Sequence, residues 1–198
     1  MKEKALRILH DEHRALSAVL SGLKELARMA QLPGMRPGFE VLRAMLYYID
    51  EFPERVHHPK EDEHLFSRVI EREPAARPLI DELVQQHRTG AVLVRDLEHA
   101  LLEFEQVGPV GAAAFASAVD KYARFQWEHM AKEEQELLPR AACCLTDADW
   151  EAIAAAFAGN NDPVADLRGQ DFDALFHRIV RLAPAPVGLG DRWNAASA

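Results

Sequence analysis

The sequence has few of the residues that build disulfide-linked or membrane-spanning proteins. It contains two cysteines, Cys143 and Cys144, which are adjacent and form neither a disulfide framework nor a CxxC motif. We interpret them as small apolar residues at a helix end, with a redox role for the pair as the alternative. No apolar run approaches the roughly 20 residues of a membrane span. The opening MKEKALRILHDEHR is too charged for a secretory signal. We therefore expect a cytoplasmic protein without a membrane partner.

Positive charge is also scarce. Lys and Arg number 23 against 32 Asp and Glu, which gives a formal net charge of -9. An excess of negative charge repels the phosphate backbone of nucleic acids and the surface of anionic membranes, so neither is an expected partner. A hydrophobic content of 48% in 198 residues is enough for one domain with a core.

Alternating strand patterns are missing, and four long amphipathic segments take their place. In each, apolar residues recur every three or four positions, which is typical of a helix with one buried face. The segments run over about 3–31, 38–72, 76–106 and 110–142, with proline and glycine at the junctions. Long helices with short connections predict an all-α, up-down-up-down four-helix bundle.

Two prolines, Pro53 and Pro59, fall inside the second segment. Each removes a backbone donor and crowds the carbonyl group four residues earlier. We expect a kink there and not two separate helices.

The remainder predicts a short C-terminal helical extension. Thr146 and Asp149 resemble a capping box at the start of a fifth helix that runs to Asn160. A further short helix is expected over 172–182, followed by an irregular tail that lies on the bundle or on a second subunit. We therefore predict a bundle over 1–145 and an extension over 146–198. The acidic surface, the apolar 172–180 segment and the proline-rich tail suggest a homodimer.

Each predicted long helix carries a histidine at an apparently inward position, and two of these have a glutamate four residues later. Residues four apart lie on the same helix face, so both side chains can reach one metal ion. Imidazole with carboxylate suits iron, manganese or zinc, and two carboxylates from opposing helices can bridge a pair of ions. A metal would also offset the cost of burying the carboxylates. The candidates are His13, His57, Glu61, His87, His129 and Glu133.

Simpler interpretations exist for each part of this set. A single inward histidine is more often a hydrogen-bonded core residue, and one His-Glu pair can be a solvated interaction on a helix surface. The combination over four segments favours a metal site. The ferritin-like template needs Glu-x-x-His on two helices, but here the pattern occurs only within 54–64. No HExxH zinc motif, Walker motif or nucleophile elbow is present.

Four pieces in order, LHDEHRAL, HHPKEDEHLF, LVQQHRTG and HMAKEE, resemble the hemerythrin-like, or HHE cation-binding, domain over roughly 3–142. The resemblance implies a four-helix bundle that holds a non-haem di-iron centre, bridged by two carboxylates and an oxo or hydroxo group. Manganese and zinc are the candidate substitutes. The ligands implied by position are His13, His57, Glu61, His87, His129 and Glu133.

The sequence departs from the oxygen-carrying hemerythrins at two positions. They have a second histidine four residues after the one matched by His87, where this chain has Ala91. Their last carboxylate is an aspartate five residues after the helix-four histidine, where this chain has Glu133 at four. Both features resemble the broader HHE subgroup and leave the site one protein ligand short. His10 and His64 are the additional candidates for that position.

Other histidines and two tyrosines receive structural interpretations. We expect His58, His99 and His177 to be surface or structural residues. For Tyr122 and Tyr47 we favour core packing with a satisfied hydroxyl, and the alternative is that they line the site or donate to a metal-bound ligand.

The leading functional hypothesis is a di-iron protein that binds O2, NO or peroxide for sensing, protection or storage. One alternative is a di-iron enzyme that turns over peroxide or repairs iron-sulfur centres. Another is a structural or interaction bundle without metal, in which the C-terminal extension mediates assembly.

Overall fold

The computed structural model describes residues 1–35, 37–158, 179–191 and 193. Most of the helix expected over 172–182 lies outside the described residues, and 179–182 are helical. The described residues form no strand and one isolated bridge, so the all-α prediction is confirmed.

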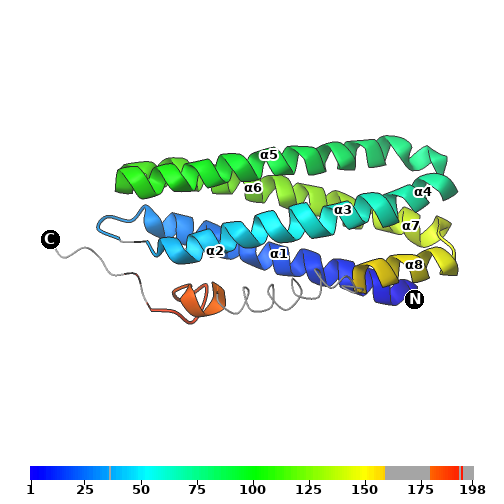
Figure 1. Cartoon of the computed structure of the whole chain (residues 1–198), viewed down its shortest axis with the longest axis horizontal. Coiled ribbons are helices and arrows are strands. Elements are labelled where there is room, and N and C mark those ends of the chain that lie inside the picture. Colours follow the sequence, from blue (N-terminus) through cyan, green and yellow to red (C-terminus); the bar gives the residue numbers. More distant parts are fainter. Residues whose placement is uncertain (36, 159–178, 192, 194–198) are drawn as a thin grey trace.

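Four long helical rods lie side by side and alternate in direction (Figure 1). Around the bundle, the first rod contacts the second and fourth, and the third contacts the same two. The first rod is α1, Lys2–Ala30, and the third is α5, Arg77–Val107. The second consists of α2, Phe39–Ile49; η1, Asp50–His57; α3, His58–Lys60; η2, Glu61–Phe66; and α4, Ser67–Arg72. The fourth consists of α6, Ala112–Lys132; η5, Glu133–Leu137; and α7, Leu138–Cys144.

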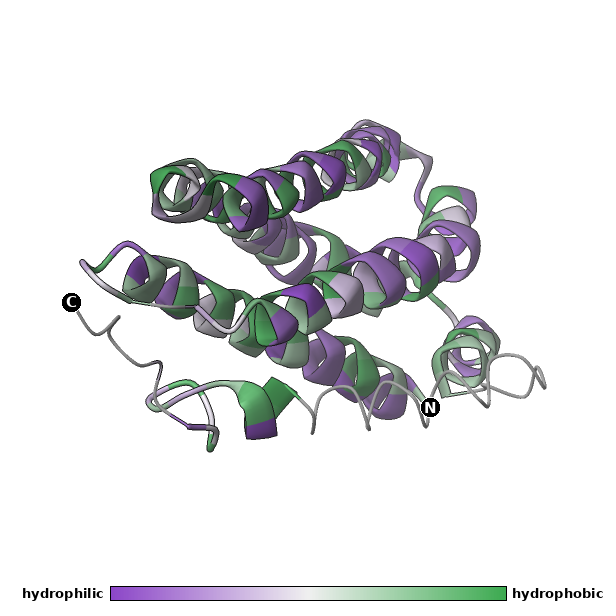
Figure 2. Ribbon diagram, turned by 60° about the vertical axis from the view of Figure 1, so that its left-hand side comes forward, coloured by the Kyte–Doolittle hydropathy of each residue, from purple (hydrophilic) through white to green (hydrophobic). Residues whose placement is uncertain are grey.

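Glycines allow the sharp connections between rods. Gly34 and Gly108 have φ angles of 75° and 69°, a region that residues with a Cβ rarely adopt. Short 3-10 turns, η3 over Pro74–Ala76 and η4 over Gly108–Gly111, lead into the third rod and the fourth. Figure 2 shows hydrophobic and hydrophilic residues mixed along each rod, as expected for helices that bury one face.

The second rod is continuous through both prolines, as the sequence predicts. Pro53 lies in η1, a π-helical stretch, and the His58 amide bonds to the Pro53 carbonyl five residues earlier. Prolines and π-helical turns are both recognised irregularities of long helices. Two further π-helical stretches begin at Glu61 and Glu133. All three therefore include candidate ligands, in line with the frequent occurrence of π-helical turns at functional sites.

The core forms two hydrophobic clusters, one toward each end of the bundle. Along α1, Leu9 belongs to one cluster and Leu16 to the other, and His13 lies between them. In the second rod, Ile49 and Leu65 mark the same division. A buried polar layer therefore separates the two hydrophobic clusters.

A fifth helix, α8, Asp147–Ala158, packs against α1 and η2. Its capping box is confirmed, because the Asp149 amide donates to Thr146 Oγ1 and the Thr146 amide donates to the Asp149 carboxylate. Beyond the gap in the described residues, Ile179 and Ala183 are buried in the bundle core. The described part of the tail is irregular and lies on the bundle, where Val187 packs over Gly22.

None of the helices in the described part of the chain combines the length and the apolar character needed to cross a lipid bilayer.

Candidate metal centre

All four rods contribute side chains to the polar layer between the two hydrophobic clusters. Every member is at most 7% exposed. The members are His13 from α1; His57, His58 and Glu61 from the second rod; His87 from α5; and His129 and Glu133 from the fourth rod.

Four of these residues form a first group, which we call the two-histidine half: His13, His57, Glu61 and Glu133. One ligand atom from each lies within 4.8 Å of the others. The Nε2 atoms of His13 and His57 are 3.2 Å apart. Glu61 Oε1 is 3.4 Å from His57 Nε2, and Glu133 Oε2 is 3.4 Å from His13 Nε2.

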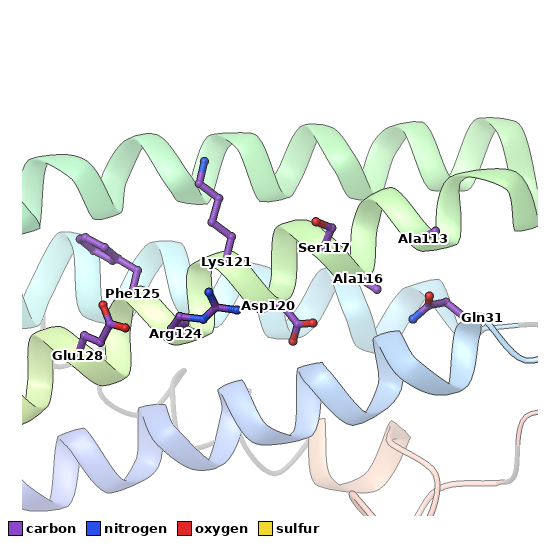
Figure 3. A pocket seen from close by; sticks show the side chains of 9 residues that line it. All are labelled: Gln31, Ala113, Ala116, Ser117, Asp120, Lys121, Arg124, Phe125 and Glu128. Carbon is purple, nitrogen blue, oxygen red and sulfur yellow. The ribbon is translucent and has the colours of Figure 1, made fainter.

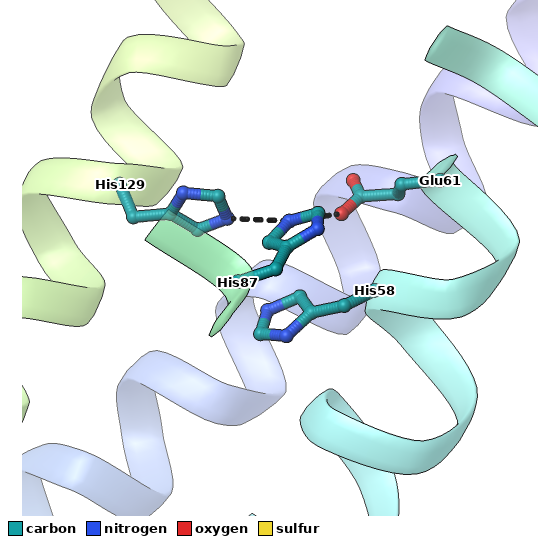
Figure 4. Close-up of side chains that lie close together, drawn as sticks. All are labelled: His58, Glu61, His87 and His129. Carbon is teal, nitrogen blue, oxygen red and sulfur yellow. Dashed lines mark hydrogen bonds and ion pairs between the residues drawn. The ribbon is translucent and has the colours of Figure 1, made fainter. Parts of the chain in front are cut away.

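The second group, the three-histidine half, contains His58, Glu61, His87 and His129, again with ligand atoms within 4.8 Å (Figure 4). The Nε2 atoms of His87 and His129 are 3.1 Å apart. Glu61 Oε2 is 3.5 Å from His87 Nε2, and Glu133 Oε1 is 3.4 Å from His129 Nε2. Each carboxylate thus presents one oxygen to each half.

The outer edges of the imidazoles are held by side chains from neighbouring helices. His13 Nδ1 lies 2.9 Å from Glu134 Oε1, and His57 Nδ1 lies 2.8 Å from Glu12 Oε2. An ionised carboxylate only accepts, so we infer that each Nδ1 carries a proton and that each Nε2, once it has no proton, presents a lone pair to the centre.

The same arrangement is found in the three-histidine half. His87 Nδ1 is 3.0 Å from Asp62 Oδ1, and His129 Nδ1 is 2.9 Å from Gln86 Oε1. A hydrogen bond at the outer nitrogen is the usual device that fixes the tautomer and orientation of a metal-binding histidine.

The central carboxylates give a direct test of whether a metal fits. Glu61 Oε2 and both carboxylate oxygens of Glu133 are buried and have no hydrogen bond among the described residues. Burying an ionised carboxylate without partners is costly, and a cation between the imidazoles would remove that cost. Donors that bind one ion at about 2.1 Å lie about 3 to 4.2 Å apart, which agrees with the separations found here. The residues therefore fit metal ions.

Titration of the site follows the balance between burial and charge. Burial lowers the pKa of His13, but the nearby carboxylates of Glu61 and Glu133 outweigh this and raise it to about 9. For His87, burial is outweighed by the hydrogen bond to Asp62 and by the nearby carboxylates of Glu133 and Glu61, which raise the pKa to about 11.

The pKa of Glu61 shifts in the opposite direction. Burial raises it, but the charge of His57 and the nearby imidazoles of His13 and His87 hold it well below its usual range. Burial lowers the pKa of His129, and burial, followed by the charges of His87 and His57, lowers the pKa of His58 well below 6.5. This imidazole is therefore neutral and free to act as a ligand.

The structure brings all six predicted candidates together, but the two additional candidates stay apart. His10 and His64 belong to neither group. Tyr122 is 1% exposed, with its hydroxyl in hydrogen bonds to Glu54 and Gln126, so core packing with a satisfied hydroxyl is its observed role. Burial raises the pKa of Glu54 to about 7, against the charge of His87 and the hydrogen bond from Tyr122.

The expectations for His58 and Tyr47 were wrong. His58 is 4% exposed and joins the three-histidine half. It thereby offers an imidazole to the site that the sequence comparison left one protein ligand short. In a regular α-helix the His58 side chain would point away from the face that carries His57. The turn before His58 is π-helical, so the direction of its side chain differs from the one that the α-helical period predicts. The HH pair of the HHPKEDEHLF motif is the signal that could have indicated it. Tyr47 is 57% exposed and His99 is exposed, while His177 lies outside the described residues.

A surface hollow of about 580 Å³ lies elsewhere, between the end of α1 and the outer face of α6 (Figure 3). It is lined by Gln31, Ala113, Ala116, Ser117, Asp120, Lys121, Arg124, Phe125 and Glu128. It shares no residue with the histidine and glutamate groups.

A match to one protein-family model agrees with this geometry. The comparison with curated proteins finds no match. The family model described as the hemerythrin HHE cation-binding domain matches residues 4–141, a span that includes both groups of ligands and more than half of the chain. The chain therefore belongs to the hemerythrin HHE cation-binding family.

Proposed function

We propose that this protein binds two iron ions, one in each half of the centre, and that the loaded centre takes up O2, NO or peroxide for sensing, protection or storage. The observation that supports this most strongly is the pair of buried carboxylates. Glu61 and Glu133 each direct one oxygen to each half, and three of their four oxygens have no hydrogen bond among the described residues. Iron would supply reversible redox chemistry and open coordination positions.

The two halves differ in the number of imidazoles they offer. The two-histidine half has His13 and His57, whereas the three-histidine half has His58, His87 and His129. Both halves share the same two carboxylates. A six-coordinate ion in the two-histidine half would therefore keep more positions for an external ligand, and we assign ligand binding to that half.

Apolar rings pack against two of the imidazoles, those of His57 and His87. The Phe157 ring of α8 meets the His57 ring edge-on at 6.1 Å, and Phe52 stacks against it at 6.1 Å. Phe66 stacks on His87 at 5.5 Å. Glu61 and Glu133 are each 1% exposed, so a small uncharged ligand such as O2 or NO would enter more readily than a hydrated ion.

The test is iron quantification together with an optical spectrum of the iron-loaded protein, before and after addition of azide, NO or peroxide. We expect two equivalents of iron and a ligand-dependent spectral change. Glu133→Ala should lower the iron content, and Glu136→Ala, an exposed position one turn later, should not. Protein purified with iron supplied that is stable and carries no metal would show a structural bundle instead. Continued consumption of peroxide would show the enzyme alternative.

A further inference from the structure

The outer nitrogen of His58 differs from those of the other four histidines. Nδ1 of His58 is buried and has no hydrogen bond among the described residues, whereas the other four Nδ1 atoms each have an oxygen partner within 3.0 Å. The ring itself is held by stacking on His87, with centroids 4.1 Å apart and planes 11° from parallel. Stacking fixes the plane of an imidazole but not which nitrogen points to the centre.

One carboxylate lies next to that nitrogen. Glu54 Oε2 is 3.5 Å from His58 Nδ1, one helical turn away on the same rod, and the Glu54 side chain is 7% exposed. Its other oxygen, Oε1, accepts hydrogen bonds from the Tyr122 hydroxyl at 3.4 Å and from Gln126 Nε2 at 3.3 Å. Gln126 Nε2 also donates to the Tyr122 hydroxyl at 2.9 Å.

The third rod leaves room for this carboxylate. A Cβ added at Gly90 would lie 3.0 Å from Glu54 Oε1 and 3.4 Å from Gln126 Nε2, which is tighter than ordinary contacts. The Glu54 carboxylate is thus confined by α6 on one side and by a bare stretch of α5 backbone on the other. Because Tyr122 and Gln126 hold Oε1, Oε2 is left facing the Nδ1 of His58.

We propose that Glu54 is a positioning residue for His58: its Oε2 accepts a hydrogen bond from the Nδ1–H of His58, and the Nε2 lone pair is thereby directed to the metal in the three-histidine half. The inference rests on the proposed function. The 3.5 Å separation is longer than a good hydrogen bond, and such contacts are often long in the unliganded form and shorten in the complex. Glu54 thus does for His58 what Glu12, Asp62, Gln86 and Glu134 do for the other four histidines.

The first test uses metal-free protein and the nitrogen chemical shifts of the His58 ring, which report its tautomer. The wild type should show protonated Nδ1. Glu54→Ala should lose that preference, and Glu54→Gln should keep most of it because an amide oxygen also accepts. Glu51→Ala is the matched control, since Glu51 lies on the same rod and its carboxylate pairs with Arg55. An unchanged His58 tautomer in Glu54→Ala would overturn the proposal.

The second test is a titration with Zn²⁺, with circular dichroism to confirm that each variant is folded. Glu54→Ala should weaken one of the two binding events by about 10- to 100-fold, the usual effect of removing such a partner. In a double-mutant cycle, adding Glu54→Ala to His58→Ala should cause no further loss. Equal losses from Glu54→Ala with and without His58 would contradict the proposal. If the wild type binds no Zn²⁺ or iron, the proposed function fails, while the tautomer measurement still decides the role of Glu54.

Discussion

His13 and His57 face each other with their Nε2 atoms 3.2 Å apart, although 44 residues separate them in the chain. Their Nδ1 atoms are occupied by Glu134 and Glu12, so both lone pairs point to the same place. Two neutral imidazoles arranged in this way repel each other unless a proton or a cation lies between them. The metal-free centre therefore holds protons where the loaded centre would hold metal.

Removal of His58 should lower the metal content of the protein. His58→Ala takes one imidazole from the three-histidine half, so we expect about one equivalent of metal in place of two, measured by elemental analysis after dialysis. His64→Ala is the control, because that side chain belongs to neither ligand group and is 30% exposed. Two retained equivalents in His58→Ala would remove His58 from the ligand set.

Metal affinity should fall as the pH falls. In the metal-free protein the pKa of His13 is about 9 and that of His87 about 11, so both carry a proton at neutral pH. Each must release it before its Nε2 can bind a metal, and protons therefore compete with the metal. Calorimetric Zn²⁺ titrations at pH 8 in two buffers of different ionisation enthalpy should show proton release, with weaker binding at pH 6. Binding without proton release would show that these imidazoles are neutral before the metal arrives.

Loss of the cap on α8 should destabilise the extension. Thr146→Ala removes the hydroxyl that accepts from the Asp149 amide, and the unfolding free energy should fall by about 1 kcal/mol in urea denaturation. Thr89→Ala is the control, because the Thr89 hydroxyl bonds within its own helix to the Gln85 carbonyl and caps nothing. Equal losses in the two variants would mean that the cap contributes nothing specific.

The same cap should make the stability of the folded state depend on pH in acid. Hydrogen bonds from Arg72 and then from Thr146 hold the pKa of Asp149 below its usual range. A depressed carboxyl pKa stabilises the folded state above the unfolded-state pKa, and this stabilisation is lost as the pH falls through the folded-state pKa. Asp149→Asn should therefore be less stable than the wild type at pH 6, and the difference should shrink below about pH 4. A constant difference from pH 6 to pH 3 would contradict this.

Phe157 should control access to the two-histidine half. Phe157→Ala removes a 5% exposed ring that contacts His57, so azide should bind the iron-loaded protein faster in stopped-flow measurements. The unfolding free energy should also fall, by about 3 kcal/mol. Ile153→Ala, on the same helix and in the same hydrophobic cluster, should lose stability without the change in rate. Equal rates in the two variants would place the entry path elsewhere.

The amino-acid sequence by itself determined the four rods and the six central candidates. Apolar residues at helical spacing fix which face of each segment is buried, and a histidine followed by glutamate four residues later fixes two donors on one face. Both are relations within a single helix, so they can be read along the chain. The capping box of Thr146 and Asp149 was readable for the same reason.

Only the tertiary structure showed that a fifth imidazole, His58, joins the ligand groups, and which side chains bond to the Nδ1 atoms of the other four histidines. Glu12 reaches His57, Asp62 reaches His87 and Gln86 reaches His129, each from a different rod, and no local spacing encodes such contacts. His58 became a candidate because π-helical turns in the second rod break the regular period from which its direction was predicted. Periodicity describes one helix at a time, whereas a metal centre depends on how four helices are rotated against one another.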